Sequence, residues 1–205
     1  NAPDIIDQMV ATEMSARHIP GISLGVLRDG KVVDLRAHGK ANLETGMPAT
    51  NETVYAIGSI TKSMTAIAIM QLQERGKIDL DRAVSEYVDD LPEAWRTITI
   101  RQLMANTSGI PEFIDNPCKH QQAADYGAGE VLAEVACLPL NFAPGERFEY
   151  SNTNFVLLSV VIERVSKQTL ADVFSAGIFA PLGMLHTQML DYVAVIPHRA
   201  DGYQW

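Results

Sequence analysis

The sequence is poor in cysteine, poor in basic residues and without long apolar runs, and each shortage excludes a class of protein. Cys118 and Cys137 are the only cysteines in 205 residues, and no Cys/His group has the spacing of a zinc site. The 16 basic residues are outnumbered by 25 acidic ones, and the net charge of −9 argues against nucleic acid or an anionic membrane surface as a partner. No apolar run approaches the ~20 residues that span a bilayer. We therefore expect no metal site, no nucleic-acid partner and no transmembrane segment.

The two cysteines leave two interpretations open. Cys118 and Cys137 flank a polar, glycine-containing stretch and a short predicted helix. A disulfide between them would add roughly 3 kcal/mol of stability in the chain-entropy account, and two unpaired thiols are the alternative. The sequence starts at Asn1 rather than Met, which a removed signal peptide or a trimmed chain would explain. The location we expect is periplasmic or secreted.

Composition and hydrophobic spacing predict an ordered chain that begins with a helix and a hairpin. Hydrophobic residues make up 47% of the sequence and charged residues 20%, which is typical of a globular protein with a core. Apolar residues recur at helical spacing over residues 3–17. Two strand-like runs, 22–28 and 31–38, are joined by Asp29-Gly30, a dipeptide that suits a two-residue turn with positive φ.

From Ser59 onwards the spacing becomes helical. Residues 64–72 are almost all apolar, which predicts a helix buried on nearly all sides. Thr99 and Gln102 have the spacing of a capping box. The further predicted helices are 99–105, 129–137, 153–166 and 170–179, followed by a loop that runs to Trp205.

The predicted sheet is too small to stand alone. An isolated two-stranded hairpin is marginal in water, and its apolar residues need further strands and a covering layer. We therefore expect an α+β fold in which residues 1–50 form part of an α/β domain and residues 51–205 form a mostly helical domain. We also expect the polypeptide to continue beyond Trp205, where the remaining strands would lie.

The segment Ser59-Ile60-Thr61-Lys62 carries candidate chemistry. A serine hydroxyl needs a nearby base to act as a nucleophile, and residues three apart share a helix face, so the Lys62 amino group can reach Ser59. The positive end of the helix dipole and an apolar environment both disfavour a charged lysine and favour a developing oxyanion. The alternative is a helix-capping Ser59 beside a solvated Lys62.

The segment Tyr150-Ser151-Asn152 is a second candidate, placed directly before a predicted helix. Tyr150 could relay a proton if a neighbouring cation lowers the pKa of its phenol from ~10. Asn152 offers a donor and an acceptor to a substrate amide or to Lys62. The alternative is a core tyrosine followed by a helix-capping asparagine.

The combination of the two segments resembles a known superfamily. Tyr150 follows Ser59 by 91 residues, which is similar to the Ser-x-x-Lys and Tyr-x-Asn spacing of class C β-lactamases and low-molecular-weight penicillin-binding proteins. That superfamily includes D-alanyl-D-alanine carboxypeptidases, D-aminopeptidases and esterases. Supporting stretches resemble it over essentially the whole chain: Ile19-Pro20-Gly21, Asn106-Thr107-Ser108-Gly109-Ile110-Pro111, Pro144-Gly145 and Pro181-Leu182-Gly183-Met184.

The resemblance implies a β-lactamase/transpeptidase-like fold and a serine hydrolase that works through an acyl-enzyme without a cofactor. Ser59 would attack a carbonyl while Lys62 and Tyr150 move its proton to the leaving group. Asn152 would position the amide of a small-molecule or peptide substrate. The substrate could be a β-lactam, a D-alanyl peptide or a small ester.

One departure from the superfamily is serious. Its third motif, Lys-Thr-Gly or His-x-Gly on a later strand, does not occur after Tyr150. We therefore expect the chain to be a fragment that associates with a missing C-terminal piece or with another copy. A penicillin- or peptidoglycan-binding sensor, or a pseudoenzyme without efficient turnover, is the alternative function. The five histidines show no spacing of a metal site or of a Ser-His-Asp triad.

Overall fold

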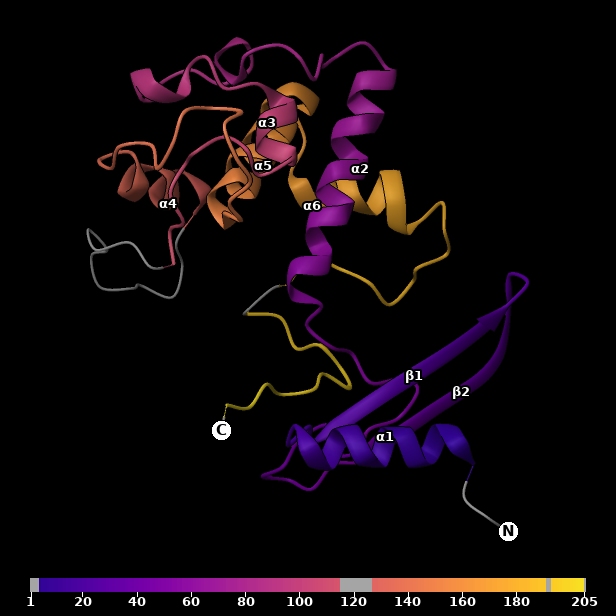
Figure 1. The fold of residues 1–205 in the computed structure, drawn as a ribbon. Coiled ribbons are helices and arrows are strands. Elements are labelled where there is room, and N and C mark those ends of the chain that lie inside the picture. Colours follow the sequence, from indigo (N-terminus) through magenta and orange to yellow (C-terminus); the bar gives the residue numbers. More distant parts are fainter. Residues whose placement is uncertain (1–3, 115–126, 191–192, 205) are drawn as a thin grey trace. The chain divides into compact units, whose positions relative to one another are not determined.

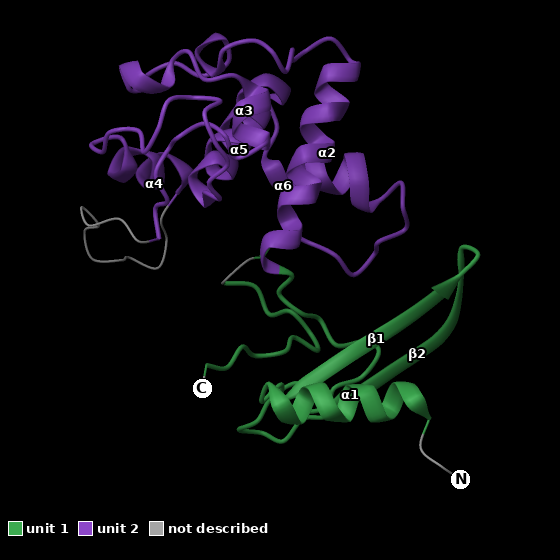
Figure 2. Cartoon of the chain, in the orientation of Figure 1, with its two compact units in different colours: residues 1–57, 190–205 green, residues 58–189 purple. Residues whose placement is uncertain are grey.

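The computed structural model describes residues 4–114, 127–190 and 193–204 (Figure 1). The chain divides into two compact units, one of residues 1–57 with 190–205 and one of residues 58–189 (Figure 2). The first unit contains a helix and a two-stranded sheet, and the second is helical. This is the mixture of elements that the sequence predicts.

The first unit is built on a helix and a hairpin. Helix α1 spans Ile5–Ala16 and begins at Asp4, whose carboxylate accepts a hydrogen bond from the Ile6 amide at 3.0 Å. Strands β1 (Gly21–Arg28) and β2 (Lys31–Gly39) pair antiparallel, with a register shift at Val26/Leu27. Their turn has positive φ at both central residues, 51° at Asp29 and 72° at Gly30, so the predicted hairpin is confirmed.

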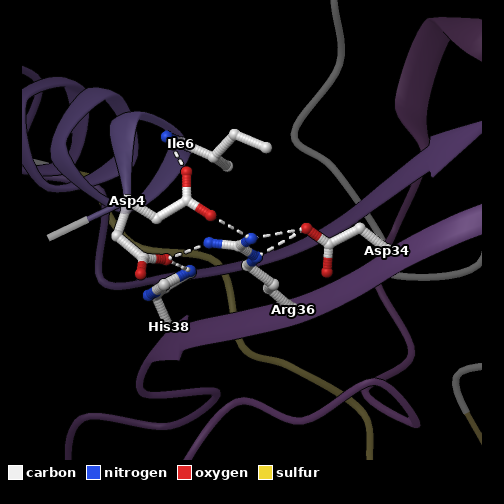
Figure 3. A network of polar contacts seen from close by, with 6 residues as sticks. Asp4, Ile6, Asp34, Arg36 and His38 are labelled. Atoms are coloured by element: carbon white, nitrogen blue, oxygen red, sulfur yellow. Dashed lines mark hydrogen bonds and ion pairs between the residues drawn. The ribbon is translucent and has the colours of Figure 1, made fainter. Parts of the chain in front are cut away.

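A charged network ties α1 to β2 (Figure 3). The Arg36 guanidinium donates to Asp34 at 2.7 Å, to Asp7 at 2.8 Å and to Asp4 at 2.6 Å. The hydrogen bond from Arg36, followed by the one from the Ile6 amide, holds the pKa of the Asp4 carboxyl below its ordinary value. The same three carboxylates raise the pKa of Arg36. The start of the helix is thus joined to the sheet through one guanidinium.

The end of the sequence belongs to the first unit. The amide of Val54 donates to His198 and the amide of Ala200 donates to Val54, each at 2.9 Å, in an isolated parallel bridge. The Tyr203 hydroxyl accepts from the Leu43 amide at 2.7 Å. The structural boundaries therefore follow residues 57 and 189, whereas the sequence suggested one boundary after residue 50. The last residues are held by isolated backbone hydrogen bonds, which leave no hydrophobic pattern in the sequence. Their association with the first unit could therefore not be predicted.

The second unit is a set of packed helices joined by short turns. Their bounds are α2 Thr61–Glu74, α3 Ile100–Met104, α4 Ala128–Val135, α5 Asn152–Ser166 and α6 Leu170–Phe174, which continues as a π-helical turn, Ser175–Phe179. Three 3-10 turns cover Gly58–Ile60, Val84–Glu86 and Glu93–Trp95. The predicted capping box at α3 is confirmed, because Thr99 and Gln102 exchange hydrogen bonds of 2.9 and 3.1 Å.

The core of this unit lies between α2, α5 and the segments around α3. Its largest fully buried side chains include Trp95, Phe174, Ile69, Ile98, Ile100, Leu103, Leu157, Leu158 and Ile162. The prediction that α2 is buried on nearly all sides is wrong. Ala68, Ile69 and Leu72 are buried, but Ile67 and Met70 are 45% and 43% exposed, because α2 packs on α5 and α6 with one face.

The structure bears in different ways on the predictions about the cysteines and about transmembrane segments. Cys118 lies outside the described residues, so its pairing with Cys137 stays a prediction; Cys137 itself is exposed. Among the described helices, none combines the length and apolar character that crossing a bilayer requires.

Candidate active site

Ser59 stands at the point where the chain enters α2. The 3-10 turn Gly58–Ile60 precedes the helix directly, and Gly58 has a φ of +51°, in the left-handed region that favours glycine. No side chain caps α2 at Ile60. The Ser59 hydroxyl is exposed and hydrogen-bonds to other side chains instead, so the structure does not support a helix-capping role.

The four residues singled out in the sequence meet in one hydrogen-bonded cluster. The Lys62 amino group donates to Ser59 Oγ at 3.0 Å and to Asn152 Oδ1 at 2.6 Å. Ser59 Oγ and Tyr150 Oη share a hydrogen bond of 2.7 Å. Tyr150 Oη also lies 3.4 Å from Asn152 Oδ1. Two residues of α2 and its entry turn are thereby brought against two residues at the start of α5.

The alternative roles for Tyr150 and Asn152 do not fit this geometry. Tyr150 is 46% exposed, so it is not a core tyrosine. Asn152 is the first residue of α5, whose N-cap is Ser151. The Asn152 side chain bonds to Lys62 and to Glu112 rather than to a free amide of the first helical turn.

Tyr150 has an unusual electrostatic environment. The hydrogen bond with Lys62, and then the one with Ser59, lower the pKa of the Tyr150 phenol from its ordinary value near 10. Partial burial and the Glu112 carboxylate act in the opposite direction and do not overcome this effect. The Lys62 amino group also lies 5.0 Å from the centre of the Tyr150 ring. A lowered pKa makes the phenol easier to ionise, and the resulting phenolate can accept the Ser59 proton.

Glu112 belongs to the site and was missed by the sequence analysis. Its Oε2 atom accepts from the Asn152 backbone amide at 2.6 Å and from Asn152 Nδ2 at 3.0 Å. Its other oxygen accepts from the Ile114 amide at 3.0 Å. Only the position of Glu112 directly after Pro111, at the end of the family-like turn, could have drawn attention to it.

The turn from Asn106 to Pro111 holds the Tyr150 segment in place. Asn106 accepts from the Glu149 amide through its backbone at 2.9 Å and from the Ser151 amide through Oδ1 at 3.1 Å. Thr153 Oγ1 donates to the Pro111 carbonyl at 2.7 Å. These bonds lie on both sides of Tyr150 and fix the backbone that presents its hydroxyl.

Buried polar groups complete this support. Asn154 Nδ2 donates to Asn106 Oδ1 at 3.0 Å, and Ser108 Oγ donates to Asn154 Oδ1 at 2.6 Å. Ser108 and Asn154 are fully buried. Gly109 has a φ of +79°, and a Cβ there would lie 2.1 Å from the Phe142 carbonyl oxygen. The turn is therefore specified by side-chain bonds and by a position that only glycine fits.

In the part of the chain that the structure describes, other candidate chemistry does not gather into a second site. Residues 21–25 have a Gly-x-Ser-x-Gly pattern, but Ser23 lies within strand β1 and its hydroxyl donates to the Thr50 carbonyl at 2.7 Å. A nucleophile elbow would place such a serine on a strand-to-helix turn. Within residues 4–114, 127–190 and 193–204, no group of three or more His, Cys, Asp or Glu side chains could hold a metal ion.

Comparison with known families shows to which family the chain belongs. The family model described as Beta-lactamase matches residues 6–205. The chain belongs to this family. The resemblance to serine β-lactamases and penicillin-binding proteins, and the β-lactamase/transpeptidase-like fold, are thereby confirmed.

Individual members of the family and solved structures show how far the similarity extends. The chain is 33% identical over 203 residues to the Protein flp of Staphylococcus aureus strain COL, which covers 97% of the chain and 41% of that protein. The octameric penicillin-binding protein homologue from Pyrococcus abyssi is 34% identical, with a TM-score of 0.76, over 87% of the chain and 42% of its own.

A third similar protein is the D-amino acid amidase from Ochrobactrum anthropi SV3, solved in complex with L-phenylalanine amide. It is 30% identical with a TM-score of 0.82, over 96% of the chain and 56% of its own. The chain spans about two fifths of the length of the curated relatives it matches.

Proposed function

We propose that the chain carries the nucleophile and proton-transfer groups of a serine hydrolase that forms an acyl-enzyme on an amide or ester. One observation carries this proposal. Ser59 Oγ is contacted by two groups able to take its proton, Lys62 Nζ at 3.0 Å and Tyr150 Oη at 2.7 Å. A serine in a merely structural role has no need of both.

The proposed reaction follows from this geometry. Ser59 Oγ attacks the substrate carbonyl carbon, and its proton passes to the Lys62 and Tyr150 pair. The bond from the acyl carbon to the leaving nitrogen or oxygen then breaks, and the leaving group receives that proton. A water molecule next attacks the ester at Ser59 and gives its proton to the same pair. The bond from the acyl carbon to Ser59 Oγ breaks, the proton passes to Ser59 Oγ, and the carboxylic acid is released.

The entry into α2 supports the charged intermediate. Ser59 lies in the turn before the helix, where free amide groups and the positive end of the helix dipole favour a developing oxyanion. The Ser59 amide is the donor that we assign to the oxyanion.

The substrate class is an acyl compound with an amide or activated ester. A β-lactam, a D-alanyl peptide and a small ester all require the same nucleophile and proton transfer. The similarity to a D-amino acid amidase supports an amide. A peptidoglycan or β-lactam substrate would be met in the periplasm or outside the cell, and that location is part of the proposal.

A sensor or pseudoenzyme is a second candidate. It is supported by the similarity to a penicillin-binding protein homologue. A protein that acylates but deacylates slowly would bind penicillin or peptidoglycan without efficient turnover.

Association with further polypeptide is also proposed. Leu27, Val33 and Leu35 of the hairpin are exposed at 67%, 55% and 56%, as expected of a sheet that packs on additional structure. A homologue that is octameric supports another copy as one such partner. A polypeptide segment that adds strands to the hairpin is the other.

A time course of covalent modification separates hydrolase from sensor. The protein is mixed with a penicillin or an activated ester, quenched at intervals and weighed by intact-mass spectrometry. A hydrolase shows an adduct that forms and then decays while product accumulates. A sensor shows an adduct that persists, and a pseudoenzyme shows none.

A further inference from the structure

Glu112 makes contacts that the catalytic scheme above does not use. We propose that Glu112 is a positioning residue that fixes the side-chain amide of Asn152 so that its oxygen faces Lys62. The proposal rests on the proposed function for its effect on rate, but its structural content can be tested without catalysis.

The chemistry of the two side chains dictates the orientation. An asparagine amide has an accepting oxygen and a donating NH₂ group, whereas a carboxylate can only accept. Glu112 Oε2 lies 3.0 Å from Asn152 Nδ2, so it holds the NH₂ end. The oxygen end is thereby directed at Lys62, 2.6 Å away. A flipped amide would place its oxygen against the carboxylate and its NH₂ group against the lysine.

Glu112 is itself held in place. Its second oxygen accepts from the Ile114 amide at 3.0 Å, and its Oε2 also accepts from the Asn152 backbone amide at 2.6 Å. The preceding residue, Pro111, accepts from Thr153 of α5. The carboxylate is thus anchored to both the turn and the start of α5, where the helix dipole favours a negative charge.

Fixing the amide in this way organises the groups around the nucleophile. Asn152 Oδ1 gives Lys62 a second acceptor besides Ser59 Oγ, which sets the direction of the lysine side chain. The Asn152 NH₂ group has two hydrogens, and only one is needed for Glu112, so the other is available to a substrate carbonyl. One carboxylate therefore supports both the base and the substrate-binding group.

The charge of Glu112 provides a readout that a purely structural role would not give. Three groups act on the Tyr150 phenol: Lys62 and Ser59 lower its pKa, and the Glu112 carboxylate opposes them. Removal of that charge should therefore let the pKa of Tyr150 fall further. Replacement of the carboxylate by an amide should also let Asn152 adopt either orientation.

Two variants of Glu112 separate charge from reach. Glu112→Gln keeps the length of the side chain and removes the charge, whereas Glu112→Asp keeps the charge and shortens the reach. Tyr150 is titrated by NMR of ring-labelled tyrosine, assigned by its loss in Tyr150→Phe. The Asn152 side-chain NH₂ resonances are assigned by their loss in Asn152→Ala. Acylation of Ser59 by an activated ester is timed in parallel.

In Glu112→Gln we expect the Tyr150 titration to move to lower pH, the Asn152 NH₂ resonances to shift and broaden, and acylation to slow by about 10-fold or more. In Glu112→Asp we expect shifted NH₂ resonances with a Tyr150 titration close to that of the wild type. Unchanged Asn152 resonances in Glu112→Gln would overturn the proposal, whether or not the Tyr150 titration moves. If the wild type itself is not acylated, the proposed function fails, while the two NMR readouts still decide the role of Glu112.

Discussion

Tyr150 is the residue whose chemistry depends most on its neighbours. Its phenol is partly exposed, yet hydrogen bonds with Lys62 and Ser59 lower its pKa. Lys62 in turn contacts three of the other groups in the cluster, Ser59 Oγ, Asn152 Oδ1 and the Tyr150 ring. At the scale of single residues, Lys62 is therefore the group on which the others depend.

Replacement of Lys62 by methionine should change both the titration and the reaction. Lys62→Met removes the largest cause of the lowered pKa, so the pKa of Tyr150 should rise towards 10. Acylation of Ser59 should slow by about 100-fold or more, because a group that takes the serine proton is lost. Ultraviolet difference titration and stopped-flow acylation measure the two effects. Lys77→Met, at an exposed lysine, serves as the control, and equal behaviour of the two variants would contradict the role of Lys62.

The sequence singles out Ser59, Lys62, Tyr150 and Asn152 through a fixed spacing on or before a helix, and the structure brings the four side chains together. Glu112 has no such spacing. It reaches Asn152 only because the turn before it folds back on α5, through buried bonds to Asn106 and Pro111. Contacts that depend on the conformation of a turn are not visible in hydrophobic periodicity.

At the scale of elements, helix starts were easier to predict than helix faces. The start of α5 and the capping box of α3 follow from local signals, and both lie where the sequence places them. The burial of α2 does not, because an apolar helix of this kind packs with one face here and leaves Ile67 and Met70 exposed. Hydrophobic periodicity shows which residues of a helix are apolar. It does not show which other elements pack against the helix, and so it does not determine which of these residues are buried.

The turn from Asn106 to Pro111 contains a glycine whose contribution to stability can be tested. Gly109→Ala places a Cβ at positive φ and 2.1 Å from the Phe142 carbonyl oxygen. Gly183→Ala is a matched control, since Gly183 has a φ of +67° and no neighbour within 4 Å of a Cβ. We expect Gly183→Ala to cost about 1 kcal/mol from the backbone conformation, and Gly109→Ala about 3 kcal/mol or more. Urea unfolding measures both, and equal losses would show that the close approach does not matter.

The Arg36 network gives the helix and hairpin of the first unit a pH dependence. Because the folded-state pKa of Asp4 lies below its ordinary value of 3.8, this contribution to stability is present above that value and is lost as the pH falls through the lowered pKa. Arg36 faces Asp4, Asp7 and Asp34, and His38 Nε2 lies 3.6 Å from Asp7.

Removal of the guanidinium should abolish this acid sensitivity. In Arg36→Met, the three carboxylates repel one another at neutral pH, and their protonation relieves the repulsion. The protection of the α1 amides against hydrogen exchange should therefore be lower than in the wild type at pH 7. This protection should not fall further below pH 3.8. Arg17→Met, which removes a single exposed pair with Glu13, is the control. The same acid-induced loss of protection in Arg36→Met as in the wild type would count against the network.

At the scale of the whole molecule, the chain contains the candidate site but spans only part of the length of its relatives. Ser59, Lys62, Tyr150 and Asn152 all lie in the second unit, residues 58–189, together with the turn that supports them. The groups that we propose to start acylation are thus contained in one compact unit. The chain nevertheless covers 41% of the Staphylococcus aureus relative, and the third motif is not among its 205 residues. Whether this unit is able to acylate is the central question.

Covalent labelling mapped to a residue answers it most directly. The protein is treated with a labelled penicillin and with an activated ester, digested, and its modified peptide is identified by mass spectrometry, with circular dichroism to show that the sample is folded. We expect one adduct, on Ser59, which is lost in Ser59→Ala and retained in Ser63→Ala, a substitution of the neighbouring exposed serine. A folded protein that forms no adduct with either reagent, or one labelled on another residue, would contradict it.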